Sequence, residues 1–153
     1  MTPRIEVYCR EDASVFRATV PWAGISIATD FGDWPEVDQA NCVGLLRLQF
    51  ADLEEPHSGE KLFDEGDAQS ILDFVGEVWS QIEILMVHCR AGLRRSPAVA
   101  GALSRIYFGH DAAWFQQGVY EPNMLVYDTL LNVARQRGLF LQARNPRRKR
   151  RRG

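Results

Sequence analysis

The sequence predicts a single α/β domain with a central, mostly parallel sheet of about four to five strands, flanked by helices and followed by a helical C-terminal part. Short apolar runs alternate with segments of helical periodicity through most of the chain, which is typical of parallel strands with helices between them. Beyond Gly109 only helical patterns follow. A chain of 153 residues with 46% hydrophobic content suits one domain with one core.

Four segments are expected to be strands. Residues 4–9 alternate apolar and polar side chains, which predicts a half-exposed strand at an edge of the sheet. Residues 22–29 form the second strand, and residues 43–50 are apolar enough to suggest burial on both faces. The fourth strand covers residues 84–88, which begin with an apolar run and end at a polar turn.

Two helices are expected before the fourth strand. A short helix capped by Asp12 or Ser14 would end before Pro21. A longer helix begins near Asp67, because apolar residues recur from there at steps of three and four. It returns the chain to the fourth strand and completes a strand–helix–strand unit.

Helices then fill the rest of the chain. Pro97 fits the first turn of a helix that ends at Gly109, because a proline lacks an N–H that this turn does not need. Residues 111–117 suggest a short helix. Asn123 is expected to cap a last helix that stops at Gly138.

Two polar loops follow predicted strands and are expected at the same edge of the sheet. The first loop, residues 30–35, contains Phe31 and Trp34, which are candidates to wall a pocket. The second loop, residues 51–66, is long for a connector and rich in charged residues, glycine and proline. We expect it to form a mobile flap.

The charge is unevenly distributed. Seven of the 18 basic residues lie in the last ten positions, so the preceding 143 residues hold 11 basic residues against 20 acidic ones. An acidic body argues against a nucleic-acid groove on the fold itself. We expect a folded domain at residues 1–143 and a disordered basic tail at 144–153, which is free to contact acidic partners.

The three cysteines, Cys9, Cys42 and Cys89, are widely spaced and form no CxxC pair. This pattern indicates neither a disulfide framework nor a metal site, and it favours a reducing, cytoplasmic setting. No run of about 18 apolar residues occurs, so no membrane span is expected. No cofactor is predicted.

The most informative segment runs from residue 84 to residue 100. It reads as a strand, a turn that contains His88 and Cys89, and a helix that opens with Arg95 and Ser96. Backbone N–H groups of such a turn, the positive end of the helix dipole and the Arg95 guanidinium would meet at one point. The segment therefore predicts an anion site with a sulfur at its floor.

Each residue of this loop can be given a chemical duty. A thiolate of Cys89 would attack phosphorus while the Arg95 fork binds two oxygens. Ser96 would hydrogen-bond the sulfur when it leaves, and His88 would hold the loop in shape. The other phosphate-binding positions are those between the cysteine and the arginine: Arg90, Ala91, Gly92, Leu93 and Arg94. The alternative interpretation of Cys89 is a buried core cysteine.

A phosphocysteine mechanism also needs an acid to protonate the leaving group. We assign Asp52, because it follows a strand expected to run parallel to the one that leads to Cys89. The rivals are Asp30, Glu54 and Glu55, and the plain alternative for Asp52 is a solvated loop carboxylate.

The segment HCRAGLRRS at residues 88–96 resembles the signature of the cysteine-dependent protein tyrosine phosphatases, and most closely that of their small dual-specificity branch. Phe50 and Asp52 are similar to that family's general-acid loop, and Pro122-Asn123 is similar to the start of its last helix. Arg94 departs from the pattern, because the dual-specificity loop commonly has serine there. The resemblance implies a parallel-rich sheet flanked by helices, no metal, and hydrolysis of phosphomonoesters.

The resulting hypothesis is a phosphatase for phosphotyrosine proteins, with phosphoserine and phosphothreonine as further substrates, whose loop also binds inorganic phosphate, vanadate or sulfate. Arg90 and Arg94 raise an alternative, a phosphatase for polyanions such as phosphoinositides or RNA 5′ phosphates. Their simpler interpretation is solvent-facing charge. A third hypothesis is a catalytically silent module that captures phosphate groups with the same loop.

Overall fold

The computed structural model describes residues 2–139 and contains a four-stranded parallel sheet. The strands are β1 (Arg4–Tyr8), β2 (Trp22–Ala28), β3 (Cys42–Gln49) and β4 (Ile84–His88). Their order in the sheet is β1-β4-β2-β3, so the last strand in the chain lies between the first two. The predicted α/β class and parallel sheet are confirmed.

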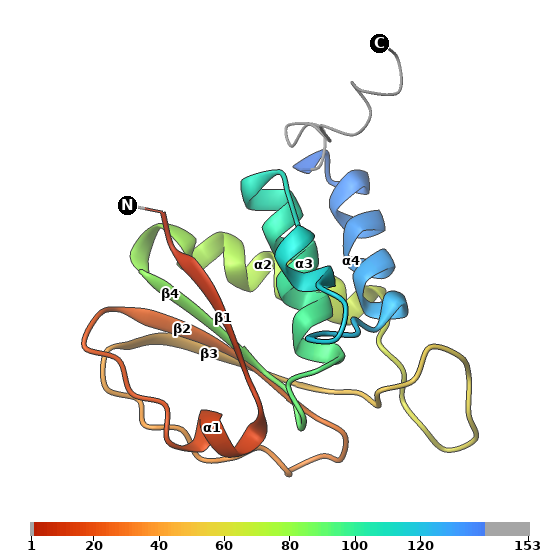
Figure 1. The fold of residues 1–153 in the computed structure, drawn as a ribbon, viewed down its shortest axis with the longest axis horizontal. Helices are drawn as coiled ribbons and strands as arrows, with labels where there is room; N and C mark the ends of the chain where they lie inside the picture. The colour runs from red at the N-terminus through yellow and green to blue at the C-terminus, as the bar shows by residue number, and fades with distance from the viewer. Residues whose placement is uncertain (1, 140–153) are drawn as a thin grey trace.

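Three long helices pack on one side of the sheet (Figure 1). They are α2 (Glu65–Val78), α3 (Arg95–Phe108) and α4 (Met124–Gln136). Three short helices complete the described part of the chain: α1 (Arg10–Ser14) and the 3₁₀ turns η1 (Trp79–Gln81) and η2 (Ala112–Phe115). None of the helices in residues 2–139 is long and apolar enough to cross a membrane.

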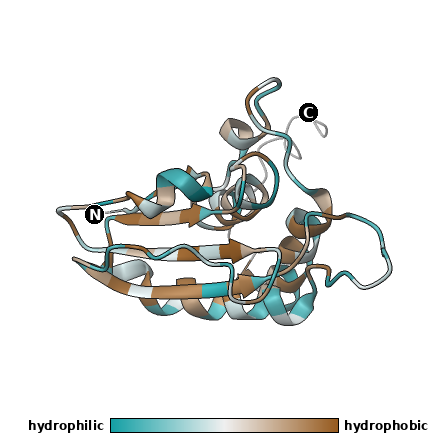
Figure 2. Ribbon diagram, turned by 90° about the horizontal axis from the view of Figure 1, so that it is seen from below, coloured by the Kyte–Doolittle hydropathy of each residue, from teal (hydrophilic) through white to brown (hydrophobic). Residues whose placement is uncertain are grey.

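Side chains of the central strands alternate between the two faces of the sheet, and both faces are covered, so both sets of side chains are buried. Leu85 and Val87 of β4 face the main core beneath α2, α3 and α4, whereas Ile84 and Met86 face a smaller core that contains Phe16. Figure 2 shows hydrophobic colour concentrated in the strands and teal over much of the loop that projects at one side. The sheet is thus covered on both faces, with the helical layer on one of them.

Local sequence signals explain where the long helices begin and end. Asp64 and Asp67 form a capping box at the start of α2, each side chain accepting the other's backbone N–H. Asn123 caps α4 by accepting the amide of Val126, as predicted. Gly109 ends α3 in the left-handed conformation, with φ of 81°.

The predicted first helix is wrong in its position. It begins at Arg10 rather than after Asp12 or Ser14, and Cys9 is its N-cap, with Sγ accepting the amide of Asp12. The Arg10 amide donates to the carbonyl of Arg90, 3.0 Å away, in the turn after β4. A five-residue helix carries too little periodicity to be placed from sequence, and here a tertiary contact fixes its start.

The expectation that residues 43–50 are buried on both faces is also wrong. β3 is an edge strand, with Val43 and Arg47 exposed and Leu48 buried. The apolar residues correctly predicted a strand, but the burial of a strand depends on its position in the sheet. By contrast, the prediction that β1 lies at an edge is confirmed.

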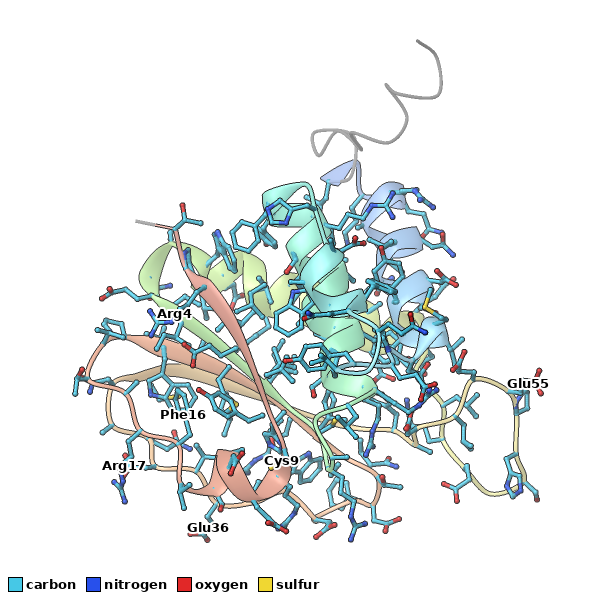
Figure 3. All side chains as sticks on the ribbon, viewed as in Figure 1. Arg4, Cys9, Phe16, Arg17, Glu36 and Glu55 are labelled. Atoms are coloured by element: carbon cyan, nitrogen blue, oxygen red, sulfur yellow. The ribbon has the colours of Figure 1, made fainter. Side chains whose placement is uncertain are left out.

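The loop between β3 and α2 projects from the body of the molecule, and Glu55 lies on it (Figure 3). It contains no helix or strand from residue 50 to residue 64, as expected. The Ala51 amide donates to the carbonyl of Lys61, 2.7 Å away, and closes the loop at its base. The predicted basic tail, residues 144–153, lies outside the described residues.

Candidate active site

The strand order places the segments that follow β1, β4 and β2 side by side at the carboxyl edge of the sheet. β4 pairs with β1 on one side and with β2 on the other, in parallel. The turn after β4, residues 89–94, therefore emerges between the segments that follow β1 and β2. Arg10 of the first segment and Asp33 of the second form an ion pair of 3.4 Å between these two flanking segments.

Cys89 is the first residue after β4, and it is 2% exposed. Its Sγ accepts the amide of Gly92 at 3.2 Å and lies 3.1 Å from Oγ of Ser96. Ser96 is in the first turn of α3, so the sulfur lies at the positive end of a 14-residue helix. The loop thus curls around the sulfur and directs at least one N–H toward it.

Gly92 is required by both the conformation and the packing of this loop. Its φ is +72°, and a Cβ at this position would lie 2.9 Å from the backbone nitrogen of Cys9 and 3.0 Å from the carbonyl carbon of Tyr8. Both contacts are to backbone atoms at the end of β1, which cannot turn aside as a side chain can. The loop is therefore seated directly against the first strand.

His88 is fully buried and braces the strand before the thiol. Its Nδ1 lies 3.2 Å from the carbonyl oxygen of Cys89, and its Nε2 lies 2.5 Å from Oγ of Ser26. Because a carbonyl can only accept, Nδ1 carries the proton and Nε2 accepts from the serine hydroxyl. Burial lowers the pKa of His88, and the charges of Arg10 and Arg95 lower it further against the opposing bond to Cys89. The imidazole is thus a neutral positioning group.

Arg95 is 4% exposed and is held by one of its nitrogens. Nη1 donates to the carbonyl of Phe50 at 2.8 Å and to Oγ1 of Thr29 at 3.0 Å. Nε and Nη2 have no hydrogen-bond partner among the described residues, and neither is a sealed, unsatisfied atom. That edge of the guanidinium is the one that binds two oxygens of an oxyanion side by side.

Asp52 lies in the loop after β3 and is held by two side chains from elsewhere in the chain. Nε of Arg94 donates to both carboxylate oxygens, at 3.1 and 3.2 Å, and Nδ2 of Asn123 donates to Oδ1 at 2.8 Å. Asn123 also donates to the carbonyl of Leu53 at 3.3 Å. The structure therefore brings the predicted acid, Asp52, to the side of the predicted phosphate loop.

Arg94 joins three segments of the chain. Beyond Asp52, its guanidinium binds the carboxylate of Glu54 and both the carbonyl and the carboxylate of Glu121. Burial alone would lower the pKa of Arg94, but the bond to Glu54 and the charge of Asp52 outweigh it and raise that pKa. The interpretation of Arg94 as a solvent-facing charge is wrong, because its side chain is 30% exposed and paired on every side.

The remaining candidates lie farther from these contacts or are exposed. Asp30 and Glu55 are exposed loop residues, while Glu54 shares Arg94 with Asp52. Arg90 is exposed in the turn after β4. Phe31 is 87% exposed and meets Trp34 edge to face at 5.4 Å between ring centroids, so an aromatic pair does stand in the loop after β2.

The described residues contain no cluster of three or more His, Cys, Asp or Glu side chains that could hold a metal ion. Cys9 and Cys42 are free and partly buried. Cys9 serves as the cap of α1, next to the backbone that contacts Gly92.

Solved structures of similar shape belong to one class of proteins. A mouse putative dual specificity phosphatase complexed with zinc tungstate matches with a TM-score of 0.62 and 17% identity, over 88% of this chain and 86% of that chain. The human tyrosine phosphatase-like serine/threonine/tyrosine-interacting protein matches with a TM-score of 0.61 and 17% identity, over 90% and 93%. Human DUSP28 gives 0.59 and 18%, over 88% and 93%.

The chain has the fold of the small dual-specificity phosphatases. The resemblance drawn from residues 88–96 is thus confirmed at the level of the fold. No family model matches the sequence, and no curated protein sequence matches it. The dual-specificity phosphatase fold is therefore recognised here by shape rather than by overall sequence similarity.

Within this phosphatase fold, two supporting residues escaped the sequence analysis. Ser26 holds His88, and Thr29 holds Arg95; both lie on or just after β2. Ser26 is a polar residue inside an otherwise apolar buried strand, which is a usable signal for a buried hydrogen bond. No comparable signal marks Thr29, because its role depends on β2 lying beside β4.

Proposed function

We propose that the protein hydrolyses phosphomonoesters through a phosphocysteine intermediate on Cys89, with phosphotyrosine in proteins as the main substrate class. The observation that carries the proposal is the convergence of three groups on one loop. The Cys89 sulfur lies at the start of α3, the Arg95 guanidinium has a free edge, and the Asp52 carboxylate is bonded to Arg94 of the same loop. These are a nucleophile, an oxyanion clamp and an acid.

In the first step the Cys89 thiolate forms an S–P bond as the P–O ester bond breaks. The electron pair of that bond stays on the ester oxygen, which takes a proton from Asp52 and leaves as a phenol or alcohol. Arg95 and the loop amides bind the non-bridging oxygens, where charge is concentrated in the transition state.

In the second step water attacks phosphorus and gives a proton to the Asp52 carboxylate. The P–S bond breaks, its electron pair returns to sulfur, and inorganic phosphate is released. The Ser96 hydroxyl, 3.1 Å from Sγ, can donate to the leaving thiolate. This is the only side-chain hydroxyl that the structure describes in hydrogen-bond contact with the sulfur.

Two observations favour phosphotyrosine over polyanionic substrates. Arg94, which raised the polyanion hypothesis, is a single cation among three carboxylates, Asp52, Glu54 and Glu121. Exposed Phe31 and half-buried Trp34 offer an aromatic surface in the neighbouring loop. Solved structures of this fold hold either class of ligand: P. aeruginosa TpbA is in complex with pTyr, and PTPMT1 with PI(5)P.

The rival from another class is a catalytically silent phosphate-binding module. One similar structure is described as tyrosine phosphatase-like, so the fold alone does not exclude this function. This chain also has a cysteine at the floor of the loop and a carboxylate in contact with the loop, which a phosphate-binding module would not need.

The deciding experiment is hydrolysis of para-nitrophenyl phosphate by the full chain and by its Cys89→Ser variant. We expect turnover that vanadate inhibits and that the variant lacks, with Cys42→Ser as the matched cysteine control. Equal activity in the Cys89→Ser variant would refute the phosphocysteine mechanism. A panel of phosphotyrosine peptides, phosphoserine peptides, phosphoinositides and 5′-phosphorylated RNA then assigns the substrate class.

A further inference from the structure

We propose that Arg94 is a positioning residue that holds Asp52 beside the phosphate loop, rather than a residue that binds substrate phosphate. The inference rests on the proposed function, because it assigns Arg94 a role in the action of the predicted acid. It concerns the one position where the loop departs from the pattern it resembles.

The first observation is that all three guanidinium nitrogens of Arg94 are already paired. Nε binds Asp52, Nη2 binds Glu54 and Nη1 binds Glu121, so each nitrogen already has an acceptor. A phosphate would have to displace carboxylates to reach this group. Arg95 differs, because it uses only Nη1 and keeps its other edge free.

The second observation is that the backbone around Arg94 is fixed to the same segment that fixes Asp52. The carbonyl of Arg94 accepts the amide of Asn123 at 3.0 Å, and the carbonyl of Leu93 accepts the amide of Glu121 at 2.9 Å. The Asn123 side chain in turn binds Asp52. Arg94 and Asn123 therefore hold the carboxylate from two directions and form a closed set of contacts with it.

The third observation concerns the loop that carries Asp52. Residues 50–64 have no helix or strand, and the loop projects from the body (Figure 1). Loops of this kind pay an entropic cost when one conformation is required for chemistry. Charge-assisted hydrogen bonds from Arg94 Nε to both carboxylate oxygens are a strong way to reduce the number of conformations near Asp52.

The test uses Arg94→Ser, with Arg137→Ser as the matched control. Arg137 is an ion-paired arginine of similar exposure, bound to Asp73 and remote from the phosphate loop. Two substrates are compared: para-nitrophenyl phosphate, whose leaving group needs little protonation, and phenyl phosphate, whose leaving group needs more. The affinity for inorganic phosphate is measured as its inhibition constant.

If Arg94 acts through Asp52, Arg94→Ser lowers kcat/KM for phenyl phosphate by about tenfold or more and for para-nitrophenyl phosphate by less than about threefold. The inhibition constant of phosphate stays within about twofold. In an Asp52→Asn background, Arg94→Ser adds less than about a twofold effect, because the group that it positions is already inactive. Arg137→Ser changes none of these values.

Two results would overturn the inference. A large loss of phosphate affinity with equal effects on both substrates would make Arg94 a phosphate ligand. If neither kcat/KM nor the inhibition constant of phosphate changed, Arg94 would have no role in catalysis or in phosphate binding. If the protein hydrolyses neither substrate, the proposed function fails and hydrogen exchange decides the inference instead: faster exchange of the amides of residues 52–55 in Arg94→Ser supports the tether, and unchanged exchange refutes it.

Discussion

The imidazole of His88 and the hydroxyl of Ser26, 62 residues apart in the chain, lie 2.5 Å from one another inside the sheet. This bond ties together the two strands on which the residues lie, one of which leads to Cys89, and burial of the imidazole lowers its pKa and keeps it out of contact with solvent. The strand end that carries the proposed nucleophile, Cys89, is therefore fixed by a buried polar pair on two adjacent strands.

The buried His88 should make stability sensitive to mild acid. Burial lowers the pKa of His88 in the folded protein, so the unfolded chain takes up a proton first as the pH falls. The contribution of His88 to the free energy of unfolding is fully present above the pKa of histidine in the unfolded chain, about 6.5. It declines as the pH falls below that value, until the lower pKa of His88 in the folded protein is reached. Urea unfolding at pH values above and below this window should show the decline. In His88→Gln this part of the slope should disappear, and an identical slope would assign it to other groups.

Replacing Gly92 with alanine should damage both stability and activity. The new Cβ would meet the backbone of Tyr8 and Cys9 at 3.0 Å or less, at a φ of +72°. We expect a loss of about 1–3 kcal/mol in the free energy of unfolding and a fall in kcat/KM of more than about a hundredfold. Gly138→Ala is the control, because Gly138 has a φ of +77° and no atom of the described residues lies within 4 Å of the new Cβ. Equal effects at both positions would mean that backbone strain, not the contact with β1, is responsible.

Replacing Ser96 with alanine should slow the second chemical step more than the first. The hydroxyl is buried and lies 3.1 Å from the Cys89 sulfur, where it can stabilise the departing thiolate. We expect kcat to fall by about tenfold to a hundredfold with a smaller change in kcat/KM, together with a burst of para-nitrophenolate. Ser104→Ala is the control on the same helix, since Ser104 is also buried but accepts from Trp114. A proportional fall in both constants, without a burst, would place Ser96 in the first step.

Asp52→Asn should impair hydrolysis according to the leaving group. Without an acid, kcat/KM for phenyl phosphate should fall by about a hundredfold or more, with a smaller effect on para-nitrophenyl phosphate. Glu54→Gln is the matched control, because it removes a carboxylate from the same loop and the same arginine. Should Glu54→Gln show the leaving-group dependence instead, Glu54 is the acid and Asp52 holds Arg94.

The sequence by itself determined the parts of this protein that depend on local patterns. The apolar runs located the four strands, and the caps at Asn123 and Gly109 located helix ends, because strand and helix signals lie within a few residues. The spacing of Cys89, Arg95 and Ser96 placed these residues in one turn, since a strand followed by a helix leaves little freedom between them. The structure confirms the contact between Cys89 and Ser96.

The tertiary structure alone decided which distant residues serve that turn. Placing β4 between β1 and β2 brings Ser26 to His88, Thr29 to Arg95 and the end of β1 against Gly92. It also gives Arg94 three acidic partners, where the sequence suggested a charge in solvent. Strand order and the pairing of loops follow from how all the elements pack together. A local pattern therefore cannot encode them, even where it singles out the proposed nucleophile.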